Sequence, residues 1–367
     1  MKRLLTLLLA LALLAVACGS DSESADGGDV DTAQANDSTT GDDDGEEDMD
    51  DGAMGDCDFD HPDEINVAYF EEWPTANQVS QADGTYDEAL CATVNWLPFP
   101  SGNEMSLAME SGDIDISYSQ GLTPFANAVT SGADLEMVGV AVAYADADQC
   151  VVHPDYNITK DNATDLEGQA VYSPIGNVTH FQLLTQLDAL GVDASQVNII
   201  PSEGGAAAVA AFESGDVAMA CAFGGSVLAM LDLGGVPLNT VEEKEAMGIR
   251  VFDIVSIPAS FGEEYPEVVT EFLQVTDDAN KAFAADRASA EPIIAETAGM
   301  DPEDATALLN QFIFFDVDTQ LSSDWMGGVA QDVMLDQMQF FQEQGEIEDA
   351  LGDYSGFVDV SYLEAVQ

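Results

Sequence analysis

The chain has 367 residues, of which 70 are acidic and seven basic, and its formal net charge is −63. Nucleic acids bind proteins through clustered Lys and Arg, so this composition excludes a nucleic-acid partner. So many acidic side chains also repel one another unless salt screens their charges. The composition therefore indicates either a saline habitat or a generally acidic proteome.

Residues 1–17 have the pattern of a secretory signal peptide. A basic dipeptide precedes an apolar run from Leu4 to Ala17, which is short for a membrane span. The small residues before Cys18 resemble a bacterial lipobox, in which the cysteine is lipidated and becomes the mature N-terminus. Ordinary cleavage after Ala17, with Cys18 unmodified, is the alternative.

Residues 18–56 are predicted to be a lipidated cysteine followed by a disordered acidic tether. The stretch 19–56 contains 15 acidic residues, no Lys or Arg, and mostly small or polar residues besides. Such a segment cannot bury enough apolar area to offset its ordering entropy, and its like charges keep it extended. A calcium loop at 42–44 is the rival interpretation, but it lacks the spaced ligands and central Gly of a known motif.

Four cysteines remain if Cys18 carries lipid: Cys57, Cys91, Cys150 and Cys221. An even number in an exported protein favours disulfides, and four cysteines allow three pairings. Their spacing does not suit a zinc site, so no metal is predicted.

From residue 57 onward, short apolar strands alternate with amphipathic helices, which favours α/β lobes with largely parallel sheets. The expected strands of the first part are 65–69, 94–99, 114–118 and 135–142, and the expected helices are 76–90 and 104–110. Another helix is expected at Thr123-Pro124, with Thr as its cap and Pro at its first position.

A second lobe is expected to begin near Gln149. Its predicted strands are 170–173, 198–201 and 217–221, and its predicted helices are 178–190 and 205–213. Gly191 is expected to end the first of these helices. The chain then returns around 248–257, and 265–367 is mostly helical. The 311 residues from 57 to 367 are enough for two lobes of ordinary size.

A helix, a Ser-Gly-Asp turn and a short strand occur twice, with the turns at 111–113 and 214–216. A Gly-containing loop follows each strand. The functional interpretation is that two similar sheets present the carboxyl ends of their strands to one ligand cleft. The plainer interpretation is that any helix–turn–strand unit tends to look like this.

The sequence contains no recognisable catalytic signature. None of its three histidines lies in a Gly-x-Ser-x-Gly or Cys–His motif, and there is no phosphate loop. Paired carboxylates are uninformative in so acidic a chain. We therefore expect no enzymatic activity and no cofactor.

The segment 173–181 is the best candidate for ligand binding. A strand ends, a Pro/Gly turn follows, and a helix begins whose free N–H groups and dipole suit an anion. Asn177 and Thr179 could add donors, although Asn177 could equally be a simple helix cap. Loss of 1–17 leaves five basic residues and a charge of −65. An anion site must therefore rely on backbone amides and hydroxyls.

Two other candidates lie near strands. The aromatic cluster 69–74 fits a cleft wall that contacts ligand carbons or a cation, while Trp73 is equally plausible as ordinary core. Asp253 follows an apolar stretch, where a charge is unfavourable unless it is paired. Its partner is either Arg250 or a ligand ammonium.

These segments resemble the taurine and alkanesulfonate branch of the solute-binding proteins of ABC transporters, over about 65–360. The motifs that carry the resemblance are Tyr86-Asp87-Glu88-Ala89-Leu90, Met109-Glu110-Ser111-Gly112-Asp113-Ile114, Thr179-His180-Phe181, Phe252-Asp253 and Gly352-Asp353-Tyr354-Ser355-Gly356-Phe357-Val358.

The resemblance implies an α/β fold of the type II periplasmic binding proteins, a "Venus flytrap" of two Rossmann-like lobes with two crossovers. The crossovers are expected near Asp148 and Arg250. Lobe 1 is expected to comprise 57–148 and 252–367, and lobe 2 to comprise 149–251. In this fold, Cys57 and Cys91 each precede a strand of lobe 1, while Cys150 and Cys221 lie on strands of lobe 2. The resemblance therefore implies the bridges Cys57–Cys91 and Cys150–Cys221.

The resemblance also implies a ligand site. A sulfonate is expected to contact the start of the helix at Val178, Thr179 and His180, and the loop Ser119-Gln120-Gly121 opposite. An ammonium is expected at Asp253. Phe223 takes the place of an aromatic wall, and Glu72 and Trp73 match some family members only. The implied ligand-binding residues are Glu72, Trp73, Ser119, Gln120, Val178, Thr179, His180, Phe223 and Asp253.

The implied function is that of a monomeric, extracytoplasmic, membrane-anchored lipoprotein. It would capture taurine or a similar small sulfonate for an ABC permease in the membrane. One alternative is a binding protein of the same fold for another small zwitterion or anion, such as an amino-carboxylate or a betaine. The other is an enzyme like those of thiamine-pyrimidine synthesis.

Overall fold

The computed structural model describes residues 57–202 and 205–366. The predicted signal peptide, Cys18, the acidic tether and the rival calcium loop at 42–44 all lie outside these residues. Among the helices that are described, none is both long and apolar enough to cross a membrane.

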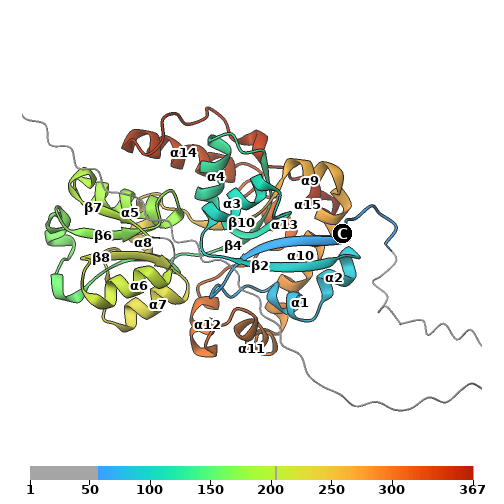
Figure 1. The fold of residues 1–367 in the computed structure, drawn as a ribbon, viewed down its shortest axis with the longest axis horizontal. Coiled ribbons are helices and arrows are strands. Elements are labelled where there is room, and N and C mark those ends of the chain that lie inside the picture. The colour runs from blue at the N-terminus through green and yellow to red at the C-terminus, as the bar shows by residue number, and fades with distance from the viewer. Residues whose placement is uncertain (1–56, 203–204, 367) are drawn as a thin grey trace, which may run out of the picture. The chain divides into compact units, whose positions relative to one another are not determined.

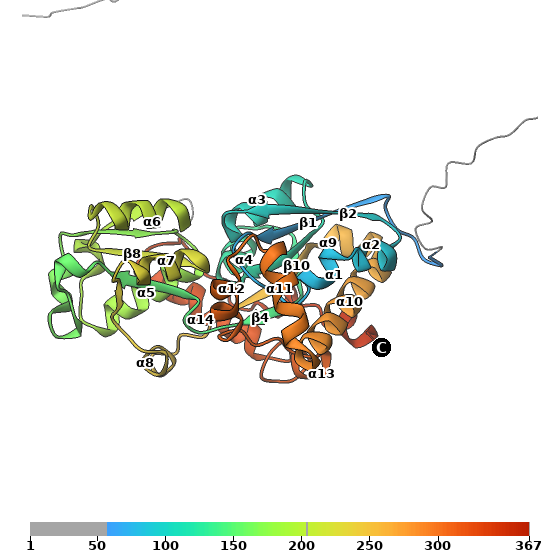
Figure 2. The ribbon, with the colours of Figure 1, turned by 90° about the horizontal axis from the view of Figure 1, so that it is seen from below.

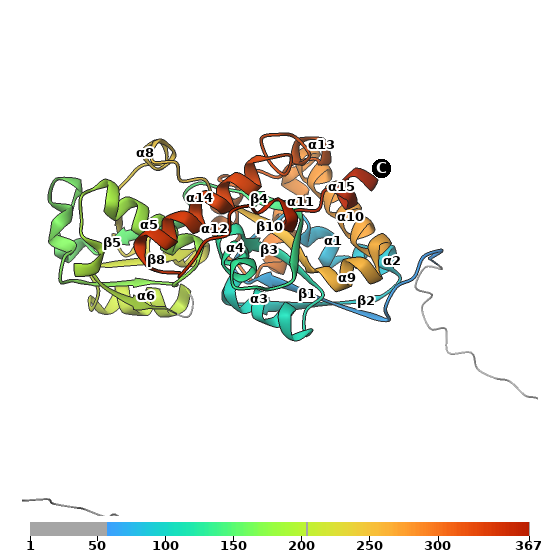
Figure 3. The same cartoon turned by 90° about the horizontal axis from the view of Figure 1, so that it is seen from above.

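The first sheet has five strands in the order β2-β1-β3-β10-β4. Figure 1 labels β2, β10 and β4, and Figure 3 labels all five. They are β1 (Glu64–Phe70), β2 (Thr93–Phe99), β3 (Ile116–Gly121), β4 (Leu135–Ala143) and β10 (Phe252–Pro258). β1 is parallel to β2 and β3, but β10 is antiparallel to both β3 and β4. The sheet is therefore mixed rather than largely parallel. The reason is that the chain returns to this sheet next to the carboxyl end of β4, so that Phe252, the first residue of β10, pairs with Ala143, the last residue of β4.

The second sheet repeats this plan in the order β7-β6-β8-β5-β9. Its strands are β5 (Asp148–Val152), β6 (Ala170–Ser173), β7 (Asn198–Pro201), β8 (Met219–Phe223) and β9 (Val236–Pro237). β6 is parallel to β7 and β8, whereas β5 is antiparallel to β8 and β9. In each sheet, the strand that runs against β3 or β8 is thus the one that enters from the other sheet.

Helices from both ends of the chain accompany the first sheet. They are α1 (Gln78–Ala82), α2 (Thr85–Leu90), α3 (Gly102–Ser111), α4 (Leu122–Thr130), α9 (Ala259–Glu264), α10 (Pro266–Ala285), α11 (Arg287–Thr297), α12 (Pro302–Leu309), α13 (Val317–Gln320), α14 (Val329–Gln344) and α15 (Ser361–Ala365). The second sheet is accompanied by α5 (Val178–Ala189), α6 (Gly205–Ser214), α7 (Gly225–Asp232) and α8 (Val241–Ala246). Short 3-10 turns occupy Pro154–Tyr156, Lys160–Leu166, Ala194–Gln196 and Ser355–Phe357.

The second sheet has a separate apolar core on each face. Cys150 and Val152 pack with residues of α5, whereas Val151, between them, packs with residues of α6 and α7. Figures 2 and 3 show α5 on one side of this sheet and α6 on the other. This is the alternation expected of a strand that is buried on both faces.

Two expected helices differ in detail. The helix expected at 76–90 is interrupted by Gly84, whose φ of +77° is left-handed and ends the first helical segment. α4 begins at Leu122, so Thr123 lies inside the helix and is not its cap. The hydroxyl of Thr123 donates instead to Oε1 of Gln337 in α14, at 2.9 Å.

The two Ser-Gly-Asp turns have the same local structure. Gly112 ends α3 with a φ of +79°, and Gly215 follows α6 with a φ of +73°. In both turns the Ser hydroxyl donates to the Asp carboxylate, at 2.8 Å in the first and 2.9 Å in the second. β3 and β8 each begin three residues after the Asp. The strands expected at 114–118 and 217–221 therefore both start two residues later than predicted.

Both predicted disulfides are present and confirm the expected pairing. Cys57 is bonded to Cys91 with a Cα–Cα distance of 6.1 Å, and Cys150 to Cys221 with 3.9 Å. Cys150 and Cys221 are direct partners across β5 and β8. Two residues along the same strand pair, Asp148 lies opposite Phe223. The second bridge therefore fixes the relative position of these two residues.

Candidate functional site

A small cavity lies between the strand ends of the two sheets. Its volume is ≈ 10 Å³, about enough for one water molecule. Residues from both sheets and from the start of α5 line it: Phe70, Trp73, Gly121, Tyr144, Asp148, Asn177, Val178, Phe223 and Asp253. Gly121 ends β3 and Phe223 ends β8, so the strands that follow the two Ser-Gly-Asp turns meet at one cavity.

Asp253 is the central acidic group of this cavity, and its side chain is 2% exposed. Its Oδ2 accepts a hydrogen bond from Oγ of Ser119 and its Oδ1 accepts one from the hydroxyl of Tyr144, both at 2.8 Å. Burial raises its pKa to about 7, although hydrogen bonds from Ser119, Tyr144 and Trp73 lower it. Two hydrogen bonds thus orient a carboxylate in a place where its charge is unfavourable.

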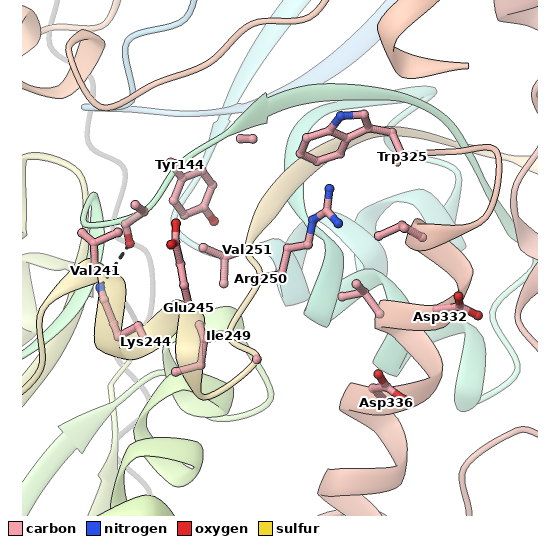
Figure 4. Close-up of a pocket in the computed structure, with 15 residues that line it drawn as sticks. Tyr144, Val241, Lys244, Glu245, Ile249, Arg250, Val251, Trp325, Asp332 and Asp336 are labelled. Carbon is pink, nitrogen blue, oxygen red and sulfur yellow. Dashed lines mark hydrogen bonds between the residues drawn. The ribbon is translucent and has the colours of Figure 1, made fainter. Parts of the chain in front are cut away.

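Arg250 does not pair with Asp253, so this alternative from the sequence is wrong. Its guanidinium lies beside Trp325 (Figure 4), 4.5 Å from the ring centre. Its Nη2 donates to the carbonyl of Asp324 at 2.7 Å. Arg250 and Asp253 are three residues apart, and an odd separation along an extended segment places the two side chains on opposite faces. Within the described part of the chain, no Lys or Arg forms an ion pair with Asp253.

Ser119 owes its orientation to an irregularity in β3. Tyr118 pairs with Val255 and Gln120 with Ile254, so Ser119 is the extra residue of a β-bulge, with a φ of +68°. Bulges redirect side chains, and a left-handed non-Gly residue at a site is typical of functional strain. Its Oγ accepts a hydrogen bond from Nε1 of Trp73 at 2.9 Å while donating to Asp253.

Trp73 is both core and cavity wall, since it is 2% exposed and also lines the cavity. Its ring centre lies 5.0 Å from that of Tyr144, 4.6 Å from that of Phe312 and 6.3 Å from that of Phe223. Phe223 also contacts Phe70, with ring centres 5.4 Å apart. The aromatic wall therefore joins residues of the first sheet to a residue of the second.

The start of α5 faces the cavity through Asn177 and Val178. Oδ1 of Asn177 accepts the N–H of Val178 at 2.7 Å, so Asn177 does have the local capping role that the sequence left open. The next residue, Thr179, is fully buried, and its Oγ1 has no hydrogen-bond partner among the described residues. A helix N-terminus carries partial positive charge, so this end of the cavity suits an anion.

Five residues named from the sequence do not line the cavity: Glu72, Ser119, Gln120, Thr179 and His180. Ser119 donates to Asp253 and Thr179 follows Val178 in α5, so these two lie next to lining residues, whereas the other three have different surroundings. Gln120 donates to the Gly102 carbonyl and to Ser106 at 2.7 and 2.6 Å, so it supports α3. His180 accepts the N–H of Gly176 at 3.2 Å through Nδ1, and burial lowers its pKa to about 4. Glu72 is exposed, and it borders surface grooves beside α6 and α7.

Asp148 and Tyr144 are cavity residues that sequence reasoning missed. Asp148 is 3% exposed, and its Oδ1 has no hydrogen-bond partner in the part of the chain that the structure describes. Burial, together with the negative charge of Asp253, raises its pKa well above the ordinary value. The available signal was an acidic residue at the start of an apolar strand, which is weak in a chain with 70 acidic residues.

The two mixed sheets, their strand orders and the shared cavity define a type II periplasmic binding protein fold. The alkanesulfonate-binding protein SsuA of Xanthomonas axonopodis pv. citri, bound to MOPS, superposes with a TM-score of 0.67 at 18% identity, over 82% of this chain and 99% of that one. SsuA of Escherichia coli superposes with a TM-score of 0.63 at 19% identity, over 79% and 90%.

Residues 98–290, more than half of the sequence, match the NMT1/THI5-like family, and the chain belongs to this family. It is also 28% identical to the taurine-binding periplasmic protein of E. coli K12 over 306 residues, which are 82% of this chain and 92% of that protein. The resemblance to the taurine and alkanesulfonate branch is thereby confirmed.

Proposed function

We propose that this protein is an extracytoplasmic solute-binding protein of an ABC importer and that it captures taurine or a similar small sulfonate. The observation that carries the proposal is the convergence of the α5 N-terminus and Asp253 on one buried cavity. Taurine has a sulfonate at one end and an ammonium at the other, so it needs one anion site and one carboxylate. The similarity to a taurine-binding protein along most of both chains supports the same ligand class.

The charge of the chain also favours a zwitterion. With a formal net charge of −63, the protein repels a net anion at long range. Only five of its seven basic residues remain after removal of the proposed signal peptide, so few positive charges oppose this repulsion. A zwitterion carries no net charge and is not repelled in this way. Its sulfonate is proposed to meet the backbone at Val178, Thr179 and His180, and its ammonium to meet Asp253.

Capture is proposed to involve movement of two lobes, 57–148 with 252–367 and 149–251. Taurine is several times larger than a water molecule, whereas the cavity volume of ≈ 10 Å³ suits about one water molecule. The ligand can therefore enter only if the residues from the two sheets first move apart, which is the hinge closure that binding proteins use.

Anchoring and partners complete the proposal. Lipidation of Cys18 would hold the protein at the membrane, and the acidic segment up to residue 56 would leave the lobes free to reach a permease. We propose a monomer with no cofactor and no catalytic role. The desulfurization enzyme DSZB shares the fold, with a TM-score of 0.59 at 14% identity over 83% of this chain and 98% of that one, so catalysis is a second function to test.

A thermal-shift screen of the folded chain tests the proposal, because a ligand that binds only the native state raises the melting temperature. Taurine is expected to give a larger shift than glycine, β-alanine or glycine betaine. Consumption of biphenyl-2-sulfinate, which a mutant of DSZB binds in a solved structure, would support an enzyme instead. A larger shift with a carboxylate or betaine than with any sulfonate would contradict the proposed ligand.

Replacement of Gly121 by Ala is expected to weaken taurine binding with little loss of stability. A Cβ atom there would lie 2.8 Å from Cγ2 of Val178 and 3.3 Å from Cδ of Pro124. Because this overlap pushes β3 away from the start of α5, closure should become less favourable by about 1–3 kcal/mol. Calorimetry measures the effect. Gly352→Ala is the matched control, since nothing lies within 4 Å of its Cβ position. Equal affinities for the two variants would contradict the steric argument.

A further inference from the structure

Two buried carboxylates, one from each sheet, line the same cavity. Asp148 begins β5 and Asp253 lies in β10, and their side chains are 3% and 2% exposed. Asp253 has hydrogen bonds to both oxygens, but Oδ1 of Asp148 has no partner among residues 57–202 and 205–366. A buried polar atom without a protein partner calls for a water molecule, a ligand or a proton.

The basic residues of the described chain are engaged elsewhere. Among the described residues, Lys244 lowers the pKa of Asp148, but its Nζ lies 2.6 Å from Oδ1 of Asp146 and donates to the Ala145 carbonyl at 3.2 Å. Figure 4 shows Lys244 and Arg250 lining a groove together with Tyr144. The remaining ion pairs are Lys160–Glu243, Lys281–Asp277 and Arg287–Glu291.

The other ionisable groups around the two carboxylates are neutral or already paired. Tyr144 donates to Asp253, and burial raises the pKa of Tyr144 and of Tyr118 well above the ordinary value. Burial likewise raises the pKa of both carboxyl groups, and the charge of Asp253 raises that of Asp148 further. Ionisation of both buried carboxylates is unfavourable when no cation is paired with either, because each charge opposes the other.

We propose that Asp148 and Asp253 form a two-carboxylate cation site that retains a proton in the ligand-free protein and exchanges it for the ammonium group of the ligand. The carboxyl O–H bond breaks and its proton passes to solvent. The ammonium keeps its own protons and donates N–H···O hydrogen bonds to the carboxylates. The identity of the ammonium as that of taurine rests on the proposed function.

This arrangement makes Asp148 a specificity-determining residue. An alkanesulfonate without an amine can satisfy the start of α5 but leaves both carboxyl groups without a cation, which disfavours it. An ammonium bound to both would also connect β5 with β10, and so would favour closure of the two sheets around the ligand. Phe70, Trp73 and Phe223 line the cavity with ring surfaces that suit a cation.

Calorimetry with taurine and ethanesulfonate tests the site in wild type, Asp148→Asn and Asp232→Asn. Asp232 is exposed at the end of α7 and serves as the matched control. At pH 6, titration in two buffers of different ionisation enthalpy should show that taurine releases close to one proton and ethanesulfonate none. Taurine affinity should rise by up to about tenfold per pH unit over the range in which the ligand-free pair holds its proton. Asp148→Asn should reduce the proton release and narrow the preference for taurine at least tenfold.

A ligand-free measurement keeps the test independent of the ligand. Because the folded protein holds a proton that the unfolded chain releases near pH 4, the wild-type melting temperature should fall more steeply between pH 4 and 7 than that of Asp148→Asn. If melting temperature depends on pH in the same way in both proteins, the proposal that the two carboxylates share a proton is wrong.

The outcomes separate the two proposals. Equal binding of taurine and ethanesulfonate without proton release would overturn the cation site and leave sulfonate capture standing. If no sulfonate binds but the melting curves diverge as expected, the proposed function fails and the proton-holding pair is supported. If β-alanine then binds with proton release, the cation site is supported with a different anion.

Discussion

Asp253→Asn is expected to weaken taurine binding by about 2–5 kcal/mol, because the ammonium would be buried opposite a neutral amide. Asp253 is 2% exposed, so water cannot solvate the ammonium in place of the lost carboxylate. The amide still offers an oxygen to one of the hydroxyls that now donate to the carboxylate. The loss of taurine affinity should therefore come from the missing negative charge and not from a change in the shape of the cavity. Calorimetry at pH 8, where the wild-type carboxyl is ionised, measures it.

The same substitution is expected to stabilise the ligand-free protein at neutral pH. The folded-state pKa of Asp253 is about 7, raised from 3.8 chiefly by burial. A carboxyl group with a raised pKa destabilises the fold progressively as pH rises from about 4 to 7, because the unfolded chain ionises first. The full effect above pH 7 is up to about 4 kcal/mol, since each pKa unit corresponds to about 1.4 kcal/mol.

Urea denaturation of Asp253→Asn and wild type at pH 4 and pH 8 checks this second expectation. The variant should gain stability relative to wild type at pH 8 and much less at pH 4. Asp232→Asn, at the exposed end of α7, should change neither stability nor affinity. Undiminished taurine binding by Asp253→Asn would contradict the assigned role. Lower stability at pH 8 would show that the carboxylate is structurally favourable.

Trp73→Ala is expected to lower the free energy of unfolding by about 3–5 kcal/mol and to abolish measurable taurine binding. The substitution removes a buried ring that packs against Tyr144, Phe223 and Phe312. It also removes the donor to Ser119, which itself donates to Asp253. Urea denaturation and calorimetry measure the two effects.

Trp73→Phe separates packing from hydrogen bonding. It keeps an aromatic ring but loses the Nε1–H that donates to Ser119, and we expect a loss of about 1 kcal/mol in taurine affinity from poorer orientation of Asp253. Trp96→Phe is the matched control, because Nε1 of Trp96 is buried without a hydrogen-bond partner among the described residues. Equal affinities for both Phe variants would show that the indole donor does not orient the site.

Local sequence signals predicted the elements that carry the site and several of the residues in it. The Ser-Gly-Asp turns depend on a left-handed Gly and a hydroxyl two residues before a carboxylate, which are local features, and both formed as expected. The polar start of α5 and the aromatic segment after β1 were likewise visible, because capping and apolar runs depend on neighbours in the chain. Family resemblance supplied the disulfide pairing and the fold.

Tertiary structure alone decided which of these residues meet. Asp148 was one acidic residue among many until β5 placed it in a cavity with Asp253, more than 100 residues away. The bulge at Ser119 exists only because β10 pairs there out of register. Arg250 is close to Asp253 in sequence but stacks on Trp325, since alternate side chains of an extended segment face opposite ways. Burial and the lack of an ion pair to either carboxylate among the described residues are properties of the assembled sheets. These properties make the two carboxylates chemically distinct from the other described acidic residues.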